Sequence, residues 1–321
     1  MTSTDPFIPL LRKLLPSYGV AASANIDLLS VSENHTYRVD AEPSPLVFRV
    51  HRHDYHTQRE ILSELDWIAA LCIDGMLSTA HPVPALDGAR LCEVVVEGKR
   101  RWVSGFSYLD GAEPKVGDHL IQSFEVLGAI NARLHQHAKA WKPPDGFVRK
   151  IWDFDLMFGS NPIWGDWRAA PLSNADKLVL EALETNLAKR LQAYGKGPSR
   201  FGLIHGDLRL ANLLDDGNRL AVIDFDDCGF GWFAYDFAAA ISFYEDDGSV
   251  PGLQAAWLKG YRNVTAFSLE DESILPTMIM ARRLLLTAWL ASRAGNDTAS
   301  VFGEGFAAGT VRLAQAYLAG D

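Results

Sequence analysis

The sequence has few cysteines and no excess of basic residues. Only Cys72, Cys92 and Cys228 occur among 321 residues, and none forms a short paired spacing. This argues against a disulfide framework or a zinc knuckle and predicts a protein of the reducing cytoplasm. Lys and Arg number 30 against 40 Asp and Glu, which gives a formal net charge of -10. A nucleic-acid partner is not expected, because phosphate backbones are bound by clustered basic side chains.

Long uninterrupted apolar runs are also missing. The most apolar late segment, MIMARRLLLTAWLA (278–291), contains Arg282 and Arg283 and is too short and too charged to span a bilayer. The first residues, MTSTDPFIPLLRKLLPSYG, lack the basic-then-apolar layout of a secretory signal. We therefore expect no membrane partner. The sequence does not indicate an oligomeric state.

Hydrophobic periodicity divides the chain into two lobes. The first, residues 1–105, shows a short helix at 5–15, strand patterns at 32–39 and 45–52, a helix at 57–72 and a strand pair bending at Glu97-Gly98. A composition shift at 106–111 predicts a linker. The rest, 112–321, is mostly helical, with apolar faces at 118–138, at 174–193 and in about three segments between 252 and 318. The pattern predicts an α+β fold with a small antiparallel-sheet lobe and a larger helical lobe.

An unusual density of acids lies in 203–227, LIHGDLRLANLLDDGNRLAVIDFDD. Its apolar runs flank Asp216-Gly217, a strong signal for a two-stranded hairpin. Because the open ends of a hairpin lie side by side, Asn212 before the first strand and Asp224 after the second should share one coordination sphere. Amide and carboxylate oxygens are hard ligands suited to magnesium, which commonly keeps phosphate oxygens as further ligands. Asp207, on the loop before the hairpin, is then available to accept a proton.

These residues carry a resemblance to a known family. His205-Gly206-Asp207, Asn212 and Asp224-Phe225-Asp226 resemble the catalytic and metal loops of kinases. The Gly after the His, and Asp-Phe-Asp in place of Asp-Phe-Gly, are similar to the aminoglycoside phosphotransferase/choline kinase superfamily, which includes type II homoserine kinases. The phrase IDFDDCGFGWFAYDFA (223–238) is most similar to the RdoA-type stress-response kinases.

The resemblance implies a bilobal protein-kinase-like fold that uses ATP and Mg²⁺. Asp207 would be the catalytic base or would orient the acceptor hydroxyl. Asn212 and Asp224 would hold magnesium on the ATP phosphates. Asp236 resembles the helical Asp that braces the catalytic loop from below.

The resemblance is less complete in the first lobe. Kinases place on the third strand a Lys that a helical Glu holds; here PLVFRVHR places Arg49 at that position. Arg49 would grip phosphate through its fork of donors, and the alternative is a surface arginine. Its helical partner would be Glu64, which we favour, or Glu60; for both, an exposed helical charge is the competing interpretation.

Two further groups are predicted to contact phosphate. The stretch 30–39 contains no glycine, and Ser32, Glu33 and Asn34 resemble a turn that offers backbone N–H groups to phosphate. Arg209 would neutralise charge on the transferring phosphate or point to solvent.

The predicted function is ATP- and Mg²⁺-dependent transfer of a γ-phosphate to a hydroxyl of a small molecule, of the aminoglycoside, homoserine or choline type. Only about eleven residues separate Asp224 from Tyr235, which leaves no long activation loop and favours a small acceptor. The alternatives are an RdoA-type kinase acting on a protein Ser or Thr, and a catalytically silent nucleotide-binding module.

Overall fold

The computed structural model describes residues 5–31, 33–114, 120–217, 219–293 and 305–320. The chain forms two compact units. The first comprises residues 1–113, 142–149 and 213–226, and the second comprises 114–141, 150–212 and 227–321. The predicted lobe boundaries at 105 and 112 stay a prediction. The structure groups the Asp216-Gly217 hairpin with the sheet-rich unit, because its second strand pairs with a strand of that unit.

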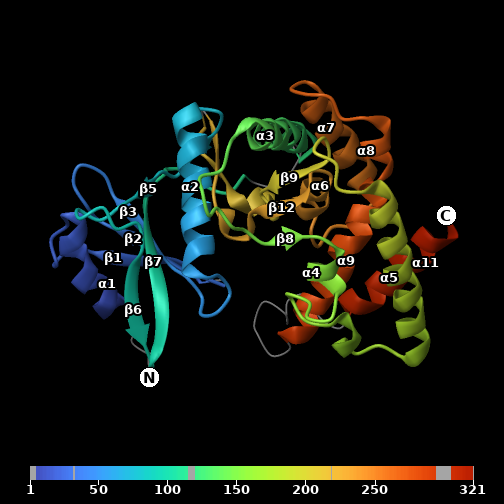
Figure 1. Ribbon diagram of the computed structural model, residues 1–321, viewed down its shortest axis with the longest axis horizontal. Helices are drawn as coiled ribbons and strands as arrows, with labels where there is room; N and C mark the ends of the chain where they lie inside the picture. The colour runs from blue at the N-terminus through green and yellow to red at the C-terminus, as the bar shows by residue number, and fades with distance from the viewer. Residues whose placement is uncertain (1–4, 32, 115–119, 218, 294–304, 321) are drawn as a thin grey trace. The chain divides into compact units, whose positions relative to one another are not determined.

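The first unit is built on an antiparallel sheet in the order β1-β2-β3-β7-β5, with β6 paired to β7 (Figure 1). The helices and strands of this unit are α1 (Ile8–Leu14), β1 (Ile26–Val31), β2 (His35–Val39), β3 (Leu46–Val50), α2 (Gln58–Asp74), β4 (Ser78–Thr79), β5 (Pro82–Val83), β6 (Cys92–Val96), β7 (Lys99–Ser107), β10 (Leu213–Asp215) and β11 (Leu220–Val222). Most of these were expected, but β1, β4 and β5 were not.

Alternation along β3 assigns its side chains to two faces. Phe48 and Val50 are buried in an apolar core that also contains Leu11 of α1. Arg49 points to the opposite face, where its guanidinium meets Glu64 of α2. One strand therefore supplies both the core and a charged group for the helix.

Helix α2 begins and ends with strong local signals. Thr57 and Glu60 form a capping box at its start, and Gly75 ends it in the left-handed conformation with φ of 61°.

The chain segment 142–149, far away in sequence, is hydrogen-bonded to this helix. Arg59 donates to the carbonyls of Asp145 and Gly146, and the Val148 amide donates to Ser63 Oγ at 3.0 Å.

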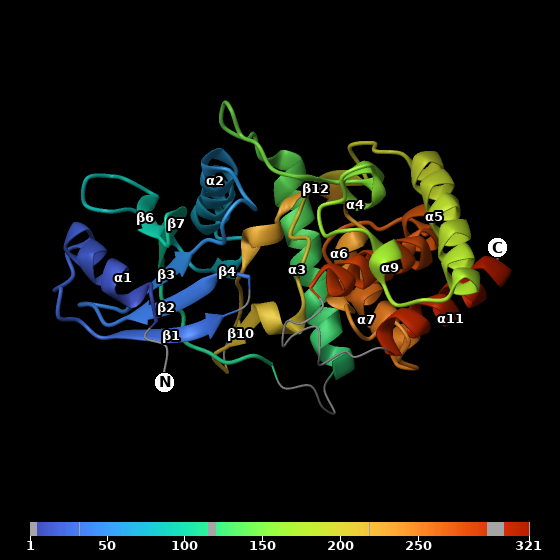
Figure 2. The same cartoon turned by 90° about the horizontal axis from the view of Figure 1, so that it is seen from below.

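The second unit is mainly helical around a three-stranded sheet in the order β8-β12-β9, which the sequence did not predict. Figure 2 gives a second view of its helices α5, α9 and α11, which pack against one another. The helices and strands of this unit are α3 (Leu120–Ala140), β8 (Ile151–Trp152), α4 (Phe154–Phe158), α5 (Asn174–Tyr194), β9 (Phe201–Ile204), β12 (Gly229–Trp232), α6 (Tyr235–Ala240), α7 (Val250–Arg262), α8 (Leu269–Ser273), α9 (Leu275–Ser292) and α11 (Gly305–Ala319).

Helices α3 and α7 cross at very short range, which two glycines permit. A Cβ at Gly128 would lie 2.0 Å from the Trp257 carbonyl oxygen, and one at Gly260 would lie 1.8 Å from that of Glu125. Any larger residue at either position would push the two helices apart.

The segment Leu269–Ser292 is long and apolar enough to cross a membrane, but 72% of its most apolar window is buried inside the protein. Arg282 and Arg283 lie in that buried part, each with an exposed side-chain fraction of 2%. Arginine is almost never buried without a partner, so this helix must face acidic groups inside the second unit.

Candidate active site

The catalytic-loop motif follows β9 in the second unit. β9 pairs antiparallel with β12, and the chain turns at Gly206 with φ of 80°. A Cβ at Gly206 would lie 2.8 Å from the carbonyl oxygen of Asp227. Both this steric clash and the positive φ therefore favour glycine at this position. A short 3-10 helix at Leu210–Asn212 then brings Asn212 back toward Asp207.

Asp236 holds this loop in place through hydrogen bonds to its backbone. It is fully buried on α6 and accepts hydrogen bonds from the backbone amides of His205 at 3.3 Å and Gly206 at 2.8 Å. Two side chains of α3, Asn131 and His135, donate to its Oδ2 at 3.2 and 2.8 Å. The brace that the resemblance implied is therefore present.

The protonation of His135 follows from its partners. Burial lowers its pKa and outweighs the opposing effect of Asp236, so the ring is neutral at neutral pH. Since a carboxylate only accepts, Nε2 carries the proton toward Asp236, and Nδ1 accepts from the Tyr261 hydroxyl at 2.9 Å.

Asp207 is held by three side chains. Arg282 Nη2 donates to Oδ1 at 2.6 Å, while Asn212 Nδ2 and Arg209 Nε donate to Oδ2 at 3.1 and 3.3 Å. Burial alone would raise the pKa of Asp207, but the charges of Arg209 and Arg282 outweigh it and hold the pKa below its usual value. Asp207 is therefore an anion at neutral pH.

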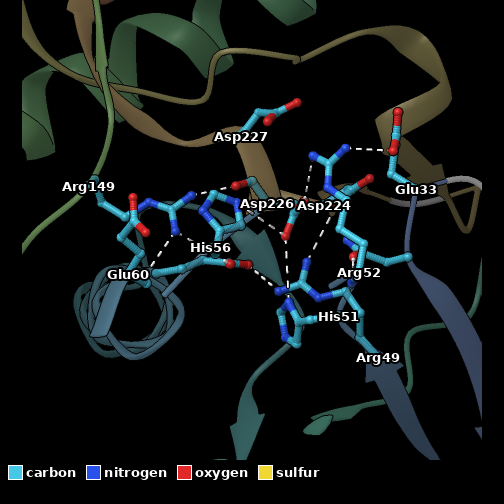
Figure 3. A network of polar contacts seen from close by, with 12 residues as sticks. Glu33, Arg49, His51, Arg52, His56, Glu60, Arg149, Asp224, Asp226 and Asp227 are labelled. Atoms are coloured by element: carbon cyan, nitrogen blue, oxygen red, sulfur yellow. Dashed lines mark hydrogen bonds and ion pairs between the residues drawn. The ribbon is translucent and has the colours of Figure 1, made fainter. Parts of the chain in front are cut away.

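The first unit contains a second group of predicted residues (Figure 3). Arg49 Nη2 pairs with Glu64 Oε1, and Arg49 Nη1 lies 3.5 Å from Asp224 Oδ1. The structure selects Glu64 over Glu60 because Glu60 is occupied in the capping box with Thr57. It also excludes the surface interpretation of Arg49, whose side chain is 8% exposed.

Asp224 stands in an unusual backbone conformation, with φ of 62°, and its side chain is 45% exposed. Aspartate is among the few residues with a side chain that adopt this region readily. The neighbouring Asp226 is buried, with Arg52 Nη2 at 3.5 Å from Oδ2 and two histidines, His51 and His56, at 3.6 and 3.7 Å from Oδ1.

The predicted phosphate-binding turn is placed only in part. Ser32 lies outside the described residues. The side chain of Asn34 is buried and accepts from the Arg52 backbone amide at 2.9 Å, and Glu33 pairs with the Arg52 guanidinium at 2.6 Å. Both side chains therefore stabilise the segment after β3, and a role of this turn in phosphate binding stays a prediction.

Sequence reasoning missed two arginines. Arg149 donates to the backbone carbonyls of Glu60 and Asp226, tying α2 to the segment that carries Asp224. Arg282 was read only as an interruption of an apolar run. The signal for Arg282 was present, since a charged residue in so apolar a helix requires a buried acid.

The Arg49–Glu64 pair carries a testable consequence for stability. Both side chains are buried, and Arg149 Nη1 lies 3.9 Å from the other Glu64 oxygen. Glu64→Gln should lower the free energy of unfolding by about 3 kcal/mol, because it leaves buried arginine charge uncompensated. Glu60→Gln on the same helix is the matched control and should change it little, since Gln also completes a capping box. Equal urea-denaturation curves for the two variants would contradict the assignment.

Comparisons with known proteins identify the family of the chain. The sequence model of the phosphotransferase enzyme family matches residues 27–267, and the chain belongs to that family. The chain is therefore a phosphotransferase, and the predicted α+β, kinase-like fold is confirmed.

Two solved structures are similar over almost the whole chain. The structure of a microcompartment-associated aminopropanol kinase is 40% identical, covers 98% of both chains and has a TM-score of 0.90. An amicoumacin kinase in complex with AMP-PNP and Ca²⁺ is 21% identical, covers 96% of this chain and 94% of its own, and has a TM-score of 0.77. An uncharacterised protein of Deinococcus radiodurans is 28% identical over 90% of this chain and 83% of its own length.

Proposed function

We propose that this protein transfers the γ-phosphate of ATP to a hydroxyl of a small amino alcohol. The observation that carries the proposal is the fixed carboxylate of Asp207, which three donors orient on a loop braced by Asp236. This arrangement is what phosphoryl transfer requires, because such reactions depend on positioning and charge neutralisation more than on covalent chemistry.

Each group has one role in this mechanism. The acceptor hydroxyl donates its hydrogen bond to Asp207, and its oxygen forms the new bond to the γ-phosphorus in line with the breaking bond to the β-phosphate oxygen. ADP leaves, and the hydroxyl proton passes to Asp207. Arg49, fixed by Glu64, would bind phosphate oxygens, and Arg209 would lie near the charge on the transferred group.

Asn212 and Asp224 are the proposed magnesium ligands, and their chemistry fits the ion. Asn212 Nδ2 donates to the Asp207 carbonyl at 2.7 Å and to its carboxylate, which assigns Oδ1 as the amide oxygen for a cation. The half-exposed carboxylate of Asp224 supplies a second hard oxygen. A bound Mg²⁺ would neutralise charge on the ATP phosphates.

Two observations support a small acceptor over a protein. The 40% identical neighbour over 98% of the chain is an aminopropanol kinase by name. The segment after Asp227 enters β12 at once and pairs with β9 and β8 before α6 begins at Tyr235. The described residues there form no extended activation segment that could bind a peptide.

A panel of acceptors with labelled ATP and Mg²⁺ tests the proposal. We expect transfer to aminopropanols, weaker transfer to the matched diols that lack the amine, and none to an unstructured Ser/Thr-rich protein. Preferential labelling of the protein substrate would support the RdoA-type alternative. Binding of ATP without turnover for any acceptor would support the silent module.

A further inference from the structure

Arg282 is the least expected neighbour of the catalytic carboxylate. It is on α9, 75 residues after Asp207, and its side chain is 2% exposed. The side chain of Trp164 lies over its guanidinium, with 5.0 Å from Cζ to the ring centroid. A buried charge in this setting is costly unless its donors are paired.

The donors of Arg282 are paired with four residues from two stretches of the chain, the catalytic loop and residues 235–242. Nε donates to Ser242 Oγ at 2.9 Å, and Nη1 contacts the Tyr235 hydroxyl at 3.2 Å and the Gly206 carbonyl at 3.4 Å. Nη2 donates to Asp207 Oδ1 at 2.6 Å. The planar fork therefore fixes the carboxylate of Asp207 relative to both α6 and α9.

The hydrogen bonds at Asp207 also differ between its two oxygens. A carboxylate offers about four acceptor positions, two on each oxygen. Asn212 and Arg209 use both positions on Oδ2, whereas Arg282 uses one on Oδ1. Among the described residues no further side chain donates to Oδ1, so its second position is the one left for a substrate.

We propose that Arg282 is a positioning residue for phosphoryl transfer, which holds Oδ1 of Asp207 where that oxygen receives the hydrogen bond of the acceptor hydroxyl. This inference rests on the proposed function. It predicts that loss of Arg282 slows the transfer step and leaves nucleotide binding intact. The reason is that Arg282 contacts Ser242, Tyr235, Gly206 and Asp207, none of which is a proposed ligand of ATP or Mg²⁺.

The adjacent Arg283 provides a matched control. It is equally buried and also paired to an acid, with Nη1 at 2.7 Å from Glu245 Oε2 and Nε at 2.9 Å from Thr310 Oγ1. Neither of these partners belongs to the catalytic loop. Substitutions at 282 and 283 therefore create comparable buried defects, of which only one touches Asp207.

The test compares Arg282→Met and Arg282→Lys with Arg283→Met and Arg283→Lys, using ATP, Mg²⁺ and an aminopropanol. We expect Arg282→Met to lower kcat by about 100-fold with KM for ATP unchanged, because misplacement of a reacting group by about 1 Å has effects of that size. Arg282→Lys should restore part of kcat. Both Arg283 variants should keep kcat per folded molecule, even where they lower the thermal unfolding temperature.

A milder variant covers the case in which Arg282→Met does not fold. Tyr235→Phe removes one acceptor of Nη1 without removing a charge, and it should lower kcat several-fold with KM for ATP unchanged. Equal kcat losses at 282 and 283, or no change in Tyr235→Phe, would overturn the inference while leaving the proposed function in place. Absence of transfer by the wild-type protein to every acceptor would overturn the proposed function, and this inference with it.

Discussion

Asp207→Asn should reduce phosphoryl transfer by about 100- to 10,000-fold, the range that a positioned acid–base group typically contributes, while nucleotide binding largely survives. Asn has the same shape but no charge, so it neither receives the acceptor proton nor balances Arg282 and Arg209. Asp207 contacts Asn212 and Arg209 of the catalytic loop and Arg282 of α9. Asn at position 207 keeps one acceptor oxygen for these donors, and Asp207 itself is not a proposed ligand of ATP or Mg²⁺.

The measurement is kcat with labelled ATP together with the dissociation constant of ATP in the presence of Mg²⁺. Asp216→Asn is the matched control, because Asn is favoured beside Gly217 in a tight hairpin turn and should leave both quantities unchanged. Wild-type turnover in Asp207→Asn would refute the role given to this carboxylate. A parallel loss of ATP affinity would instead indicate that Asp207 acts in nucleotide binding.

Asp224→Asn should have an effect of similar size on transfer and should also weaken Mg²⁺-dependent nucleotide binding at least about tenfold, or about 1.4 kcal/mol. The physical reason is the loss of the only formal negative charge in the proposed pair of magnesium ligands. Asn is the appropriate replacement, since it tolerates the left-handed backbone at this position, where φ is 62°.

Asp224→Ala separates the two contributions of this residue. Alanine at a positive φ strains the backbone as well as removing the carboxylate, so this variant should be less stable than Asp224→Asn but no less deficient in metal-dependent binding. Titration calorimetry with ATP, with and without Mg²⁺, gives the affinities. If Asp224→Asn retained the wild-type response to Mg²⁺, the ion would have to be held elsewhere.

Local patterns were sufficient for the elements with strong signals. Helix α2 has an apolar face, a capping box and a terminal glycine, and the hairpin of β10 and β11 has Asp216-Gly217 between two apolar runs. Strands β8, β9 and β12 contain only two to four residues each, and their pairing joins segments distant in the chain. Such short strands have too few alternating residues to be recognised in the sequence. Whether they form is also decided by tertiary contacts with their partner strands.

The site shows the same division. The amino-acid sequence by itself predicted the hairpin and identified Asp207, Asn212 and Asp224 as the candidate site residues, because they lie within 18 positions of one another and motif spacing constrains them. Only the tertiary structure decided that Glu64 and not Glu60 meets Arg49, and that Arg282 meets Asp207. A buried guanidinium needs a carboxylate partner. Which carboxylate pairs with it depends on how the helices pack, and this cannot be predicted from the spacing of residues along the chain.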